Sequence, residues 1–307
     1  MELAGKTAIV TGAGTSVGRA LALEFARAGA NAVCCGRREA PLQETARLIE
    51  ENGGSALAVP TDVSDWSQVR SMVDAVLRRF GRIDLLFNNA GSFRFVGPVW
   101  EADPEEWWAD VRTNLLGSMQ CCRAVLPHMI ERNSGILINM DGGGGSLGPN
   151  IGGSAYGCSK AAICRFTEGL ARELEREGYG ILAFCMMPGF VRSEMTDSLT
   201  ATPERLKWQS HVIGLRGSPA EFPADACARA TMELLRIAGP ELNGRIFYVD
   251  TDFQRIGKNK TKIEHEDLYV LHLMTLDGVL GPWPKEVEKQ RRPKRPHPGS
   301  GADPVIH

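Results

Sequence analysis

The sequence lacks the segments that would place it in or across a membrane. It contains no stretch of about 18 apolar residues, and its start has no basic segment followed by an apolar run. Charge of one sign is not in excess either, because 35 lysines and arginines stand against 37 aspartates and glutamates, for a formal net charge of −2. Neither a membrane nor nucleic acid is therefore an expected partner, and we expect a soluble cytoplasmic protein.

The cysteines lack the spacing of a metal or disulfide framework. None of the eight forms a Cys-x-x-Cys pair, and most fall in segments with strand or helix patterns. We interpret them as small buried residues of a protein in a reducing compartment, with no metal site. They are Cys34, Cys35, Cys121, Cys122, Cys158, Cys164, Cys185 and Cys227.

What the chain does contain is an alternation of short β-rich apolar runs with longer helical patterns. This predicts an α/β fold: a doubly wound, Rossmann-type parallel β-sheet with helices on both faces, in a single domain plus a C-terminal extension. Strands are expected at 6–11, 31–36, 56–60, 83–87, 135–140, 180–186 and 244–249. Helices are expected at 16–29, 39–52, 65–80, 104–113, 117–132, 153–177 and 222–238.

The composition changes near residue 254. We expect residues 1–253 to form a dinucleotide-binding catalytic domain and residues 254–307 to form the extension. Within the domain, 194–221 has weak periodicity and is the expected substrate lid. Within the extension, 266–274 has the pattern of one more short element, and the basic, proline-rich stretch 285–296 is expected to be disordered.

Tyr156 and Lys160 stand four residues apart in an expected helix, which places both side chains on one face. An ammonium beside a phenol stabilises the phenolate, so we expect the pKa of Tyr156 to fall toward working pH. Such a tyrosine is a candidate acid or base for the oxygen of an alcohol or carbonyl.

A glycine-rich turn near the N-terminus joins an apolar strand to an apolar-periodic helix. Gly12 and Gly18 bracket this turn. The backbone amides and the dipole at such a helix start attract phosphate, so the turn predicts a site for a dinucleotide pyrophosphate.

With these motifs in place, the chain resembles the short-chain dehydrogenase/reductase family from about residue 3 to about residue 252. Five motifs occur in the family's order. They are Thr11-Gly12-x-x-x-Ser16-x-Gly18, Asn88-Asn89-Ala90-Gly91, the catalytic-asparagine position Asn114, Tyr156-x-x-x-Lys160, and Pro188-Gly189-Phe190-Val191-Arg192-Ser193.

The resemblance implies a role for each motif. Tyr156 would move the proton, Lys160 would bind the nicotinamide ribose, and Asn114 would anchor a water chain that resupplies the proton. The resemblance also implies a homodimer or homotetramer. The implied cofactor-binding residues are Gly12, Thr15, Ser16, Val17, Gly18, Asp62, Val63, Asn89, Ala90, Gly91, Tyr156, Lys160, Pro188, Gly189, Val191 and Ser193.

Arg37 and Arg38 follow the second expected strand, where an acidic residue would favour NAD by binding the ribose 2′-hydroxyl. Arginine forks match a 2′-phosphate, so NADP(H) is the preferred cofactor and NAD(H) remains possible. The alternative is that these arginines cover the adenine or face solvent.

One departure from the family stands out. The family carries a catalytic serine about 13 residues before its tyrosine, and that count lands here on Gly143, with Gly142 or Gly144 one residue to either side. None has a hydroxyl. The Asn-Met-Asp-Gly-Gly loop that contains them is similar to that of the chlorophyll b reductase branch.

Three explanations of this loop remain open. Ser146 supplies a displaced hydroxyl, or a buried Asp141 of raised pKa takes part, or the backbone amides of Gly142 to Gly144 hold the substrate oxygen. Asp141 and Ser146 are equally compatible with simple loop capping.

The function favoured by these observations is an NADP-dependent oxidoreductase that interconverts a secondary alcohol and a ketone or aldehyde, with room for a bulky substrate. Its walls would come from Phe93, Arg94, Phe95, Trp208 and His211. An alternative is a redox-neutral lyase, dehydratase or isomerase that binds the dinucleotide but lacks the serine. The intact Asn114, Tyr156 and Lys160 argue against a third class, a cofactor sensor or scaffold.

Overall fold

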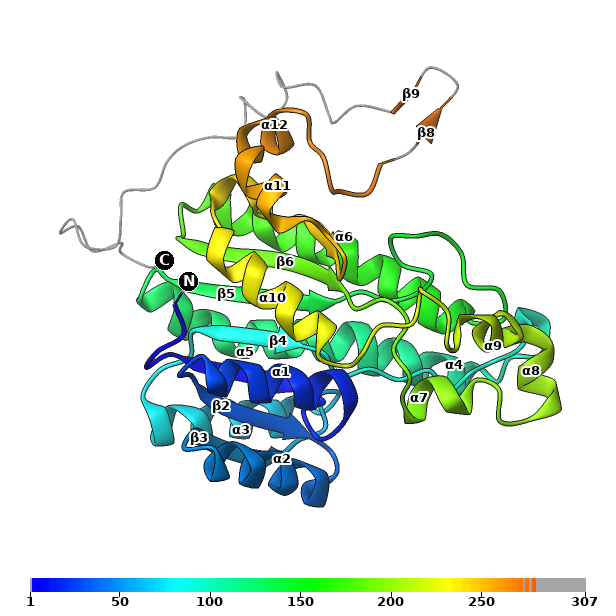
Figure 1. Cartoon of the computed structure of the whole chain (residues 1–307), viewed down its shortest axis with the longest axis horizontal. Coiled ribbons are helices and arrows are strands. Elements are labelled where there is room, and N and C mark those ends of the chain that lie inside the picture. The colour runs from blue at the N-terminus through cyan, green and yellow to red at the C-terminus, as the bar shows by residue number, and fades with distance from the viewer. Residues whose placement is uncertain (1, 273, 276–277, 280–307) are drawn as a thin grey trace, which may run out of the picture.

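The structure is a computed structural model that describes residues 2–272, 274–275 and 278–279. Its centre is a seven-stranded parallel sheet with the strand order β3-β2-β1-β4-β5-β6-β7 (Figure 1). The strands are β1 (Thr7–Thr11), β2 (Asn31–Gly36), β3 (Ser55–Pro60), β4 (Leu85–Asn88), β5 (Gly135–Met140), β6 (Ile181–Met187) and β7 (Ile246–Tyr248). The predicted fold class is confirmed, and each expected strand lies within about two residues of its predicted bounds.

Helices cover both faces of the sheet, because alternate strand residues point to opposite sides. On β1, Ala8 and Val10 pack into the core cluster that contains α1, α2 and α10, whereas Ile9 packs with α3, α5 and α6 (Figure 1). The bounds are α1 (Ser16–Arg27), α2 (Glu39–Glu51), α3 (Trp66–Phe80), α4 (Pro104–Val111), α5 (Gly117–Glu131), α6 (Ser154–Arg176) and α10 (Ala226–Ile237).

Two of these helix boundaries differ from the sequence pattern. The expected helices at 104–113 and 117–132 are joined by a π-helical turn, η2 (Arg112–Leu116), so the chain stays helical through Asn114. The helix expected from 222 begins instead at Ala226, because Phe222 N donates to Phe190 O and the chain is still extended there.

The expected lid, 194–221, is more ordered than its weak periodicity suggested. It holds three short helices, each stabilised by packing rather than by its own length. They are α7 (Glu194–Ser198), α8 (Pro203–Gln209) and α9 (His211–Leu215). Two single-turn 3₁₀ segments lie elsewhere, η1 (Val99–Glu101) and η3 (Pro240–Leu242).

The chain after residue 253 continues to pack on the domain. Phe253 and Ile256 of α11 (Phe253–Lys258) and Ile263 of α12 (Lys260–His265) are buried in the same core as α1 and α10. The division into domains at 253 therefore stays a prediction.

The prediction of a short element over 266–274 is wrong for most of that stretch. The chain turns there, and Tyr269 O accepts from Ile246 N beside β7. Of the residues described in this stretch, 266–272 and 274, only Met274 belongs to a strand, β8 (Met274–Thr275), which pairs with β9 (Gly278–Val279). The basic stretch 285–296 lies outside the described residues.

Asp84 joins the start of the central strands. Its buried carboxylate accepts from Thr7 N at 2.9 Å and from the Arg82 guanidinium at 2.6 and 2.7 Å. Burial acts to raise the pKa of Asp84, but the hydrogen bonds from Arg82 and Thr7 outweigh it and hold that pKa below its usual value. Asp84 is therefore a charged tie between β1 and β4.

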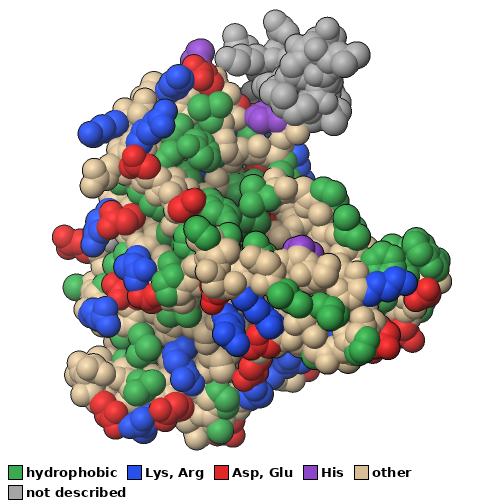
Figure 2. Space-filling view, turned by 45° about the vertical axis from the view of Figure 1, so that its right-hand side comes forward, with side chains coloured by type: hydrophobic (Ala, Val, Ile, Leu, Met, Phe, Trp, Pro, Cys, Tyr) green, Lys and Arg blue, Asp and Glu red, His purple; other side chains and the backbone are tan. Residues whose placement is uncertain are grey.

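Seven of the eight cysteines are buried, which confirms their interpretation as core residues, whereas for Cys158 that interpretation is wrong because its side chain is exposed. Among the described residues no helix is long and apolar enough to cross a bilayer. Over the same ranges, no three His, Cys, Asp or Glu side chains gather as metal ligands would. Positive and negative side chains are interspersed on the face shown in Figure 2, in keeping with the balanced charge.

Candidate functional site

A cavity of about 730 Å³ opens along the carboxyl ends of the strands. Its lining begins where each strand stops: Gly12 follows β1, Asn89 follows β4 and Pro188 follows β6. Ligands of open parallel sheets bind at this edge. Every residue predicted to contact a cofactor lines the cavity, namely Gly12, Thr15, Ser16, Val17, Gly18, Arg37, Arg38, Asp62, Val63, Asn89, Ala90, Gly91, Tyr156, Lys160, Pro188, Gly189, Val191 and Ser193.

The glycine turn is shaped by close backbone contacts. A Cβ on Gly18 would lie 2.1 Å from Gly12 O, so no side chain fits there, and Gly12 itself has φ of 69°. Ser16, which replaces the family's middle glycine, also takes a left-handed φ of 46° as α1 begins. The Thr15 side chain makes no capping bond, so it leaves the first amides of α1 directed at the cavity.

The loop after β4 supports this turn from the side. Asn89 Nδ2 donates to Thr11 O at 2.8 Å, and Ala90 N donates to Thr11 Oγ1 at 2.9 Å. Asp62, after β3, accepts from the amide and hydroxyl of Ser64 within its own loop. The ends of β1 and β4 are therefore tied to each other at the cavity.

The two arginines after β2 differ in their contacts. Arg38 forms an ion pair of 3.0 Å with Glu194, the first residue of α7 in the lid. Arg37 has no hydrogen bond or ion pair to any residue within the described ranges. Arg37 is therefore the arginine whose guanidinium is free to bind an anionic group.

Tyr156 and Lys160 both lie in α6 and line the cavity, where Lys160 is buried and Tyr156 is partly buried. Lys160 Nζ donates to Met140 O at 2.8 Å and lies 5.5 Å from the centre of the Tyr156 ring. Lys160 is 3% exposed, so its ammonium must keep hydrogen-bond acceptors close by.

The expected lowering of the Tyr156 pKa is wrong for this structure. Burial raises the pKa of Tyr156 well above its ordinary value, and the carboxylates of Asp141 and Asp110 raise it further. Burial also lowers the pKa of Lys160. Desolvation thus outweighs the ammonium, and Tyr156 is a protonated hydroxyl at neutral pH.

Phe93 fixes the Tyr156 ring from its other side. The two rings are stacked, with centroids 4.4 Å apart and planes 7° from parallel. Phe93 was expected only as a substrate wall. Its stacking on the catalytic candidate depends on a contact between residues 63 positions apart, which no local pattern encodes.

Asn114 is buried behind the cavity rather than in its wall. Its Nδ2 donates to Ser92 O and to Ser159 Oγ, both at 2.9 Å, and its Oδ1 accepts from Ser92 N at 2.7 Å. Since Ser159 directly precedes Lys160, Asn114 ties η2 to the catalytic end of α6. The predicted water chain stays a prediction.

The glycine loop after β5 meets Tyr156 through Gly142. A Cβ on Gly142 would lie 2.3 Å from the Tyr156 hydroxyl, whereas one on Gly143 has no neighbour closer than 3.7 Å. Of the three glycines only Gly144 has a left-handed backbone, with φ of 92°. The loop therefore brings bare backbone against the Tyr156 hydroxyl at 142 and leaves space at 143.

Asp141 and Ser146 pair with each other. Ser146 Oγ donates to Asp141 Oδ2 at 2.5 Å and its backbone N donates to the same oxygen at 3.2 Å. Ser146 does not line the main cavity, whereas the buried Asp141 does. This geometry is the loop-capping arrangement, so Ser146 is poorly placed to replace the missing hydroxyl.

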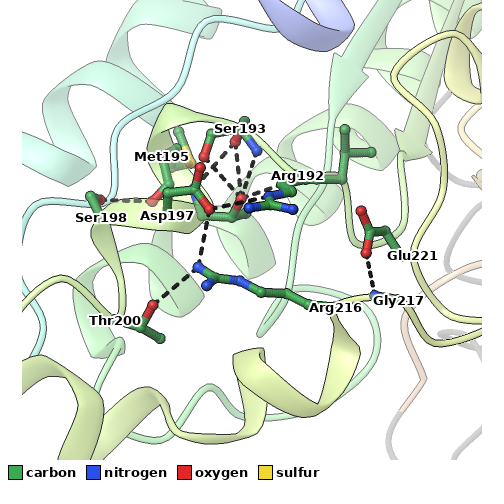
Figure 3. Close-up of polar contacts among 11 residues, drawn as sticks. Arg192, Ser193, Met195, Asp197, Ser198, Thr200, Arg216, Gly217 and Glu221 are labelled. Atoms are coloured by element: carbon green, nitrogen blue, oxygen red, sulfur yellow. Dashed lines mark hydrogen bonds and ion pairs between the residues drawn. The ribbon is translucent and has the colours of Figure 1, made fainter.

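The lid is held by polar contacts beyond Ser193 (Figure 3). Ser193 caps α7 in a reciprocal arrangement with Thr196. Arg216 Nη2 donates to Asp197 Oδ1 at 3.0 Å and to Thr200 Oγ1 at 3.1 Å, and Arg192 lies 3.7 Å from the same carboxylate. Asp197 thus connects the motif at 188–193 to the end of α9.

The remaining cavity wall is largely apolar. Of the expected walls, Phe93 and His211 line it, whereas Arg94, Phe95 and Trp208 do not. Among the polar lining residues that sequence reasoning missed are Asn150 and Gln209. The apolar lining is Leu147, Phe190, Met195, Leu199, Val212 and Leu215.

Comparison with known proteins identifies relatives of this arrangement. Residues 6–204 match the family described as short chain dehydrogenase. A short chain dehydrogenase of Pseudocercospora fijiensis is 38% identical over 236 residues, covering 74% of this chain and 75% of that protein. Two solved structures have the same fold. A variant of actinorhodin polyketide ketoreductase with NADPH has a TM-score of 0.71 at 27% identity, covering 80% of this chain and 95% of that one. A short chain dehydrogenase/reductase from Burkholderia phymatum with NAD has a TM-score of 0.73 at 25% identity, covering 90% and 100%.

Proposed function

Because the chain belongs to the short-chain dehydrogenase family, we propose that it is an NADP-dependent oxidoreductase that interconverts a secondary alcohol and a ketone or aldehyde. One observation carries the proposal. The Tyr156 hydroxyl and all the motif residues for a nicotinamide dinucleotide line one cavity of about 730 Å³. This volume falls within the range of small-molecule and cofactor sites.

The chain's own part in the chemistry is proton transfer. The reduced cofactor supplies the hydride to the carbonyl carbon. Tyr156 gives its proton to the carbonyl oxygen, so the ketone becomes an alcohol and the tyrosine is reprotonated from solvent. Because its pKa is raised, Tyr156 carries its proton at neutral pH, which is the form that the reductive direction requires.

Lys160 and Asn114 support this step. Lys160 Nζ makes one bond to Met140 O, which leaves N–H groups for the hydroxyls of a bound ribose and for the tyrosinate that forms. Asn114 holds the start of α6 through Ser159, and so fixes where Lys160 and Tyr156 stand.

NADP(H) is the proposed preference, with NAD(H) possible. The support is the free guanidinium of Arg37 at the end of β2, where a 2′-phosphate would lie and no acidic residue is present. Relatives of this fold are known with either cofactor, so the preference depends on these side chains rather than on the fold.

The proposed substrate is a bulky, mainly apolar carbonyl compound. The support is the apolar lining contributed by the lid and by Phe93, together with the space at Gly143. One of the solved structures with the same fold is a polyketide ketoreductase, which agrees with a ketone substrate for this chain.

A second candidate is a redox-neutral lyase, dehydratase or isomerase on the same site. The glycines at 142–144 favour it, because the hydroxyl that family members use to hold the substrate oxygen is missing. The likeness of this loop to chlorophyll b reductases is a hypothesis about loop type and names no substrate.

The test is a panel of ketones and aldehydes with NADPH and, separately, NADH, followed by cofactor absorbance at about 340 nm. Oxidation of NADPH with a bulky ketone, lost in Tyr156→Phe while cofactor binding persists, is the expected result. Conversion of a substrate without any change in absorbance would support the redox-neutral reading instead.

We also propose a cytoplasmic homodimer or homotetramer with the catalytic unit in residues 1–253. Light scattering on the purified full chain measures the assembly, and a chain ending at residue 253 tests the division. Burial of Ile256 and Ile263 in the core leads us to expect lower stability for that shorter chain.

A further inference from the structure

The side chain nearest to the missing serine is Asn150. The family's serine corresponds to about residue 143, and a Cβ placed on Gly143 would have Asn150 Nδ2 as its nearest neighbour, at 3.7 Å. A serine hydroxyl extends one bond beyond its Cβ. The amide nitrogen therefore lies within hydrogen-bonding reach of the region that this hydroxyl would occupy.

The orientation of the Asn150 amide is fixed by Gln209 of the lid. Gln209 Nε2 donates to Ile151 O at 2.8 Å, and a backbone carbonyl can only accept, so nitrogen must face it. The same nitrogen donates to Asn150 Oδ1 at 3.0 Å. Asn150 therefore presents its oxygen to the lid and its Nδ2 toward the glycine loop.

Glycines allow Asn150 to approach this closely. A Cβ on Gly144 would lie 2.9 Å from Asn150 Cβ, and one on Gly153 would lie 2.8 Å from Asn150 Oδ1. The loop 141–153 thus folds over Asn150 and packs its amide against the start of α6.

The Asn150 amide has a donor to spare. Its contact with Gly143 O is long, at 3.4 Å, and uses one of two N–H groups. No other acceptor within the described residues bonds to Nδ2. Asn150 also lines the cavity together with Gly142, Gly143 and Tyr156.

We propose that Asn150 Nδ2 is a catalytic hydrogen-bond donor that holds the substrate carbonyl oxygen in place of the missing serine hydroxyl. The inference rests on the proposed function, since it assigns a group to the same reduction. Tyr156 and Asn150 would then contact one oxygen from two sides: the first donates its proton, and the second stabilises the charge that develops before the proton arrives. Gln209 acts as a positioning residue, because it reaches the substrate only through Asn150.

The experiment compares steady-state NADPH oxidation by the full-length protein and its variants, with the ketone on which the parent is most active. Asn150→Ala should lower kcat by about 10²-fold, the scale for losing one oxyanion donor, with a smaller change in KM. Gln209→Leu should lower kcat less, because the amide of Asn150 is then present but free to turn. Ile151→Ala is the matched control. The Ile151 side chain is 70% exposed, and the substitution keeps the backbone carbonyl to which Gln209 donates.

Rescue separates a catalytic from a structural role. In Asn150→Ala, the further change Gly143→Ser should raise kcat at least tenfold, because a hydroxyl then stands beside the place that the amide nitrogen occupied. NADPH affinity from cofactor fluorescence should stay within about twofold throughout, which shows that each variant folds and keeps the cofactor half of the cavity.

The outcomes distinguish this inference from the function it rests on. If the parent reduces the ketone and Asn150→Ala keeps kcat within threefold, Asn150 holds no substrate oxygen and the proposed reaction survives. A loss of kcat that Gly143→Ser leaves unchanged also overturns the assignment, in favour of a packing role. If the parent oxidises NADPH with no carbonyl compound of the panel, the proposed function fails and the role of Asn150 fails with it.

Discussion

Gly142 and Gly143 offer a pair of identical substitutions, one residue apart, with opposite expected results. Neither glycine has a left-handed φ, so alanine meets no backbone strain at either position. The Cβ of Gly142→Ala would lie 2.3 Å from the Tyr156 hydroxyl and 2.9 Å from its Cζ. The Cβ of Gly143→Ala would meet only Asn150 Nδ2, at 3.7 Å.

The expected loss of kcat in Gly142→Ala follows from how far the Tyr156 side chain must move. An ordinary contact needs about 1 Å more than the 2.3 Å available, and the ring cannot slide sideways without losing its stack on Phe93. A displacement of about 1 Å from reacting geometry costs about 10²-fold in rate. We therefore expect Gly142→Ala to lower kcat by about 10²-fold and Gly143→Ala to keep kcat within about threefold.

The assay is NADPH oxidation with the panel ketone, together with NADPH affinity and the midpoint of urea unfolding for both variants. NADPH affinity and the unfolding midpoint should stay near the parent values, because the clash is confined to the outer end of the Tyr156 side chain. Equal kcat for the two variants would refute the reasoning. So would a large loss in Gly143→Ala alone, which would mean that the Tyr156 hydroxyl does not lie against Gly142 in the working enzyme.

Three other predictions concern the cofactor, the loop and stability. Arg37→Asp should shift the ratio of kcat/KM for NADPH over NADH toward NADH by at least tenfold. Arg38→Asp should shift it by less, because Arg38 is already paired with Glu194 of the lid. An unchanged ratio in both variants would mean that neither arginine contacts the ribose. Ser146→Ala should leave kcat within about threefold, since Ser146 does not line the cavity and its hydroxyl donates to Asp141; a loss near 10²-fold would make it the displaced catalytic hydroxyl. Asp84→Asn should lower the free energy of unfolding at pH 7 by about 2 kcal/mol. Because the pKa of Asp84 is lower in the folded state, its carboxylate contributes fully to the free energy of unfolding above the unfolded pKa of about 3.9. That contribution is lost as pH falls through the folded pKa. The free energies of unfolding of parent and variant, measured by urea titration, should therefore converge at the lowest pH.

The amino-acid sequence by itself determined the sheet, most of the helices and the position of the cofactor-lining residues. Strand and helix periodicities are local, and three of the motifs lie at the ends of strands, so parallel pairing alone brings Gly12, Asn89 and Pro188 to one edge. The family motif also identified Tyr156 and Lys160, because a four-residue spacing in a helix places both side chains on one face.

Only the tertiary structure decided what surrounds those residues. The stack of Phe93 on Tyr156 and the bond from Gln209 to Asn150 join residues 63 and 59 positions apart, and no periodicity links them. The direction of the Tyr156 pKa was decided in the same way. Sequence spacing shows an ammonium nearby, whereas the opposing desolvation exists only once the side chain is buried by the packed fold.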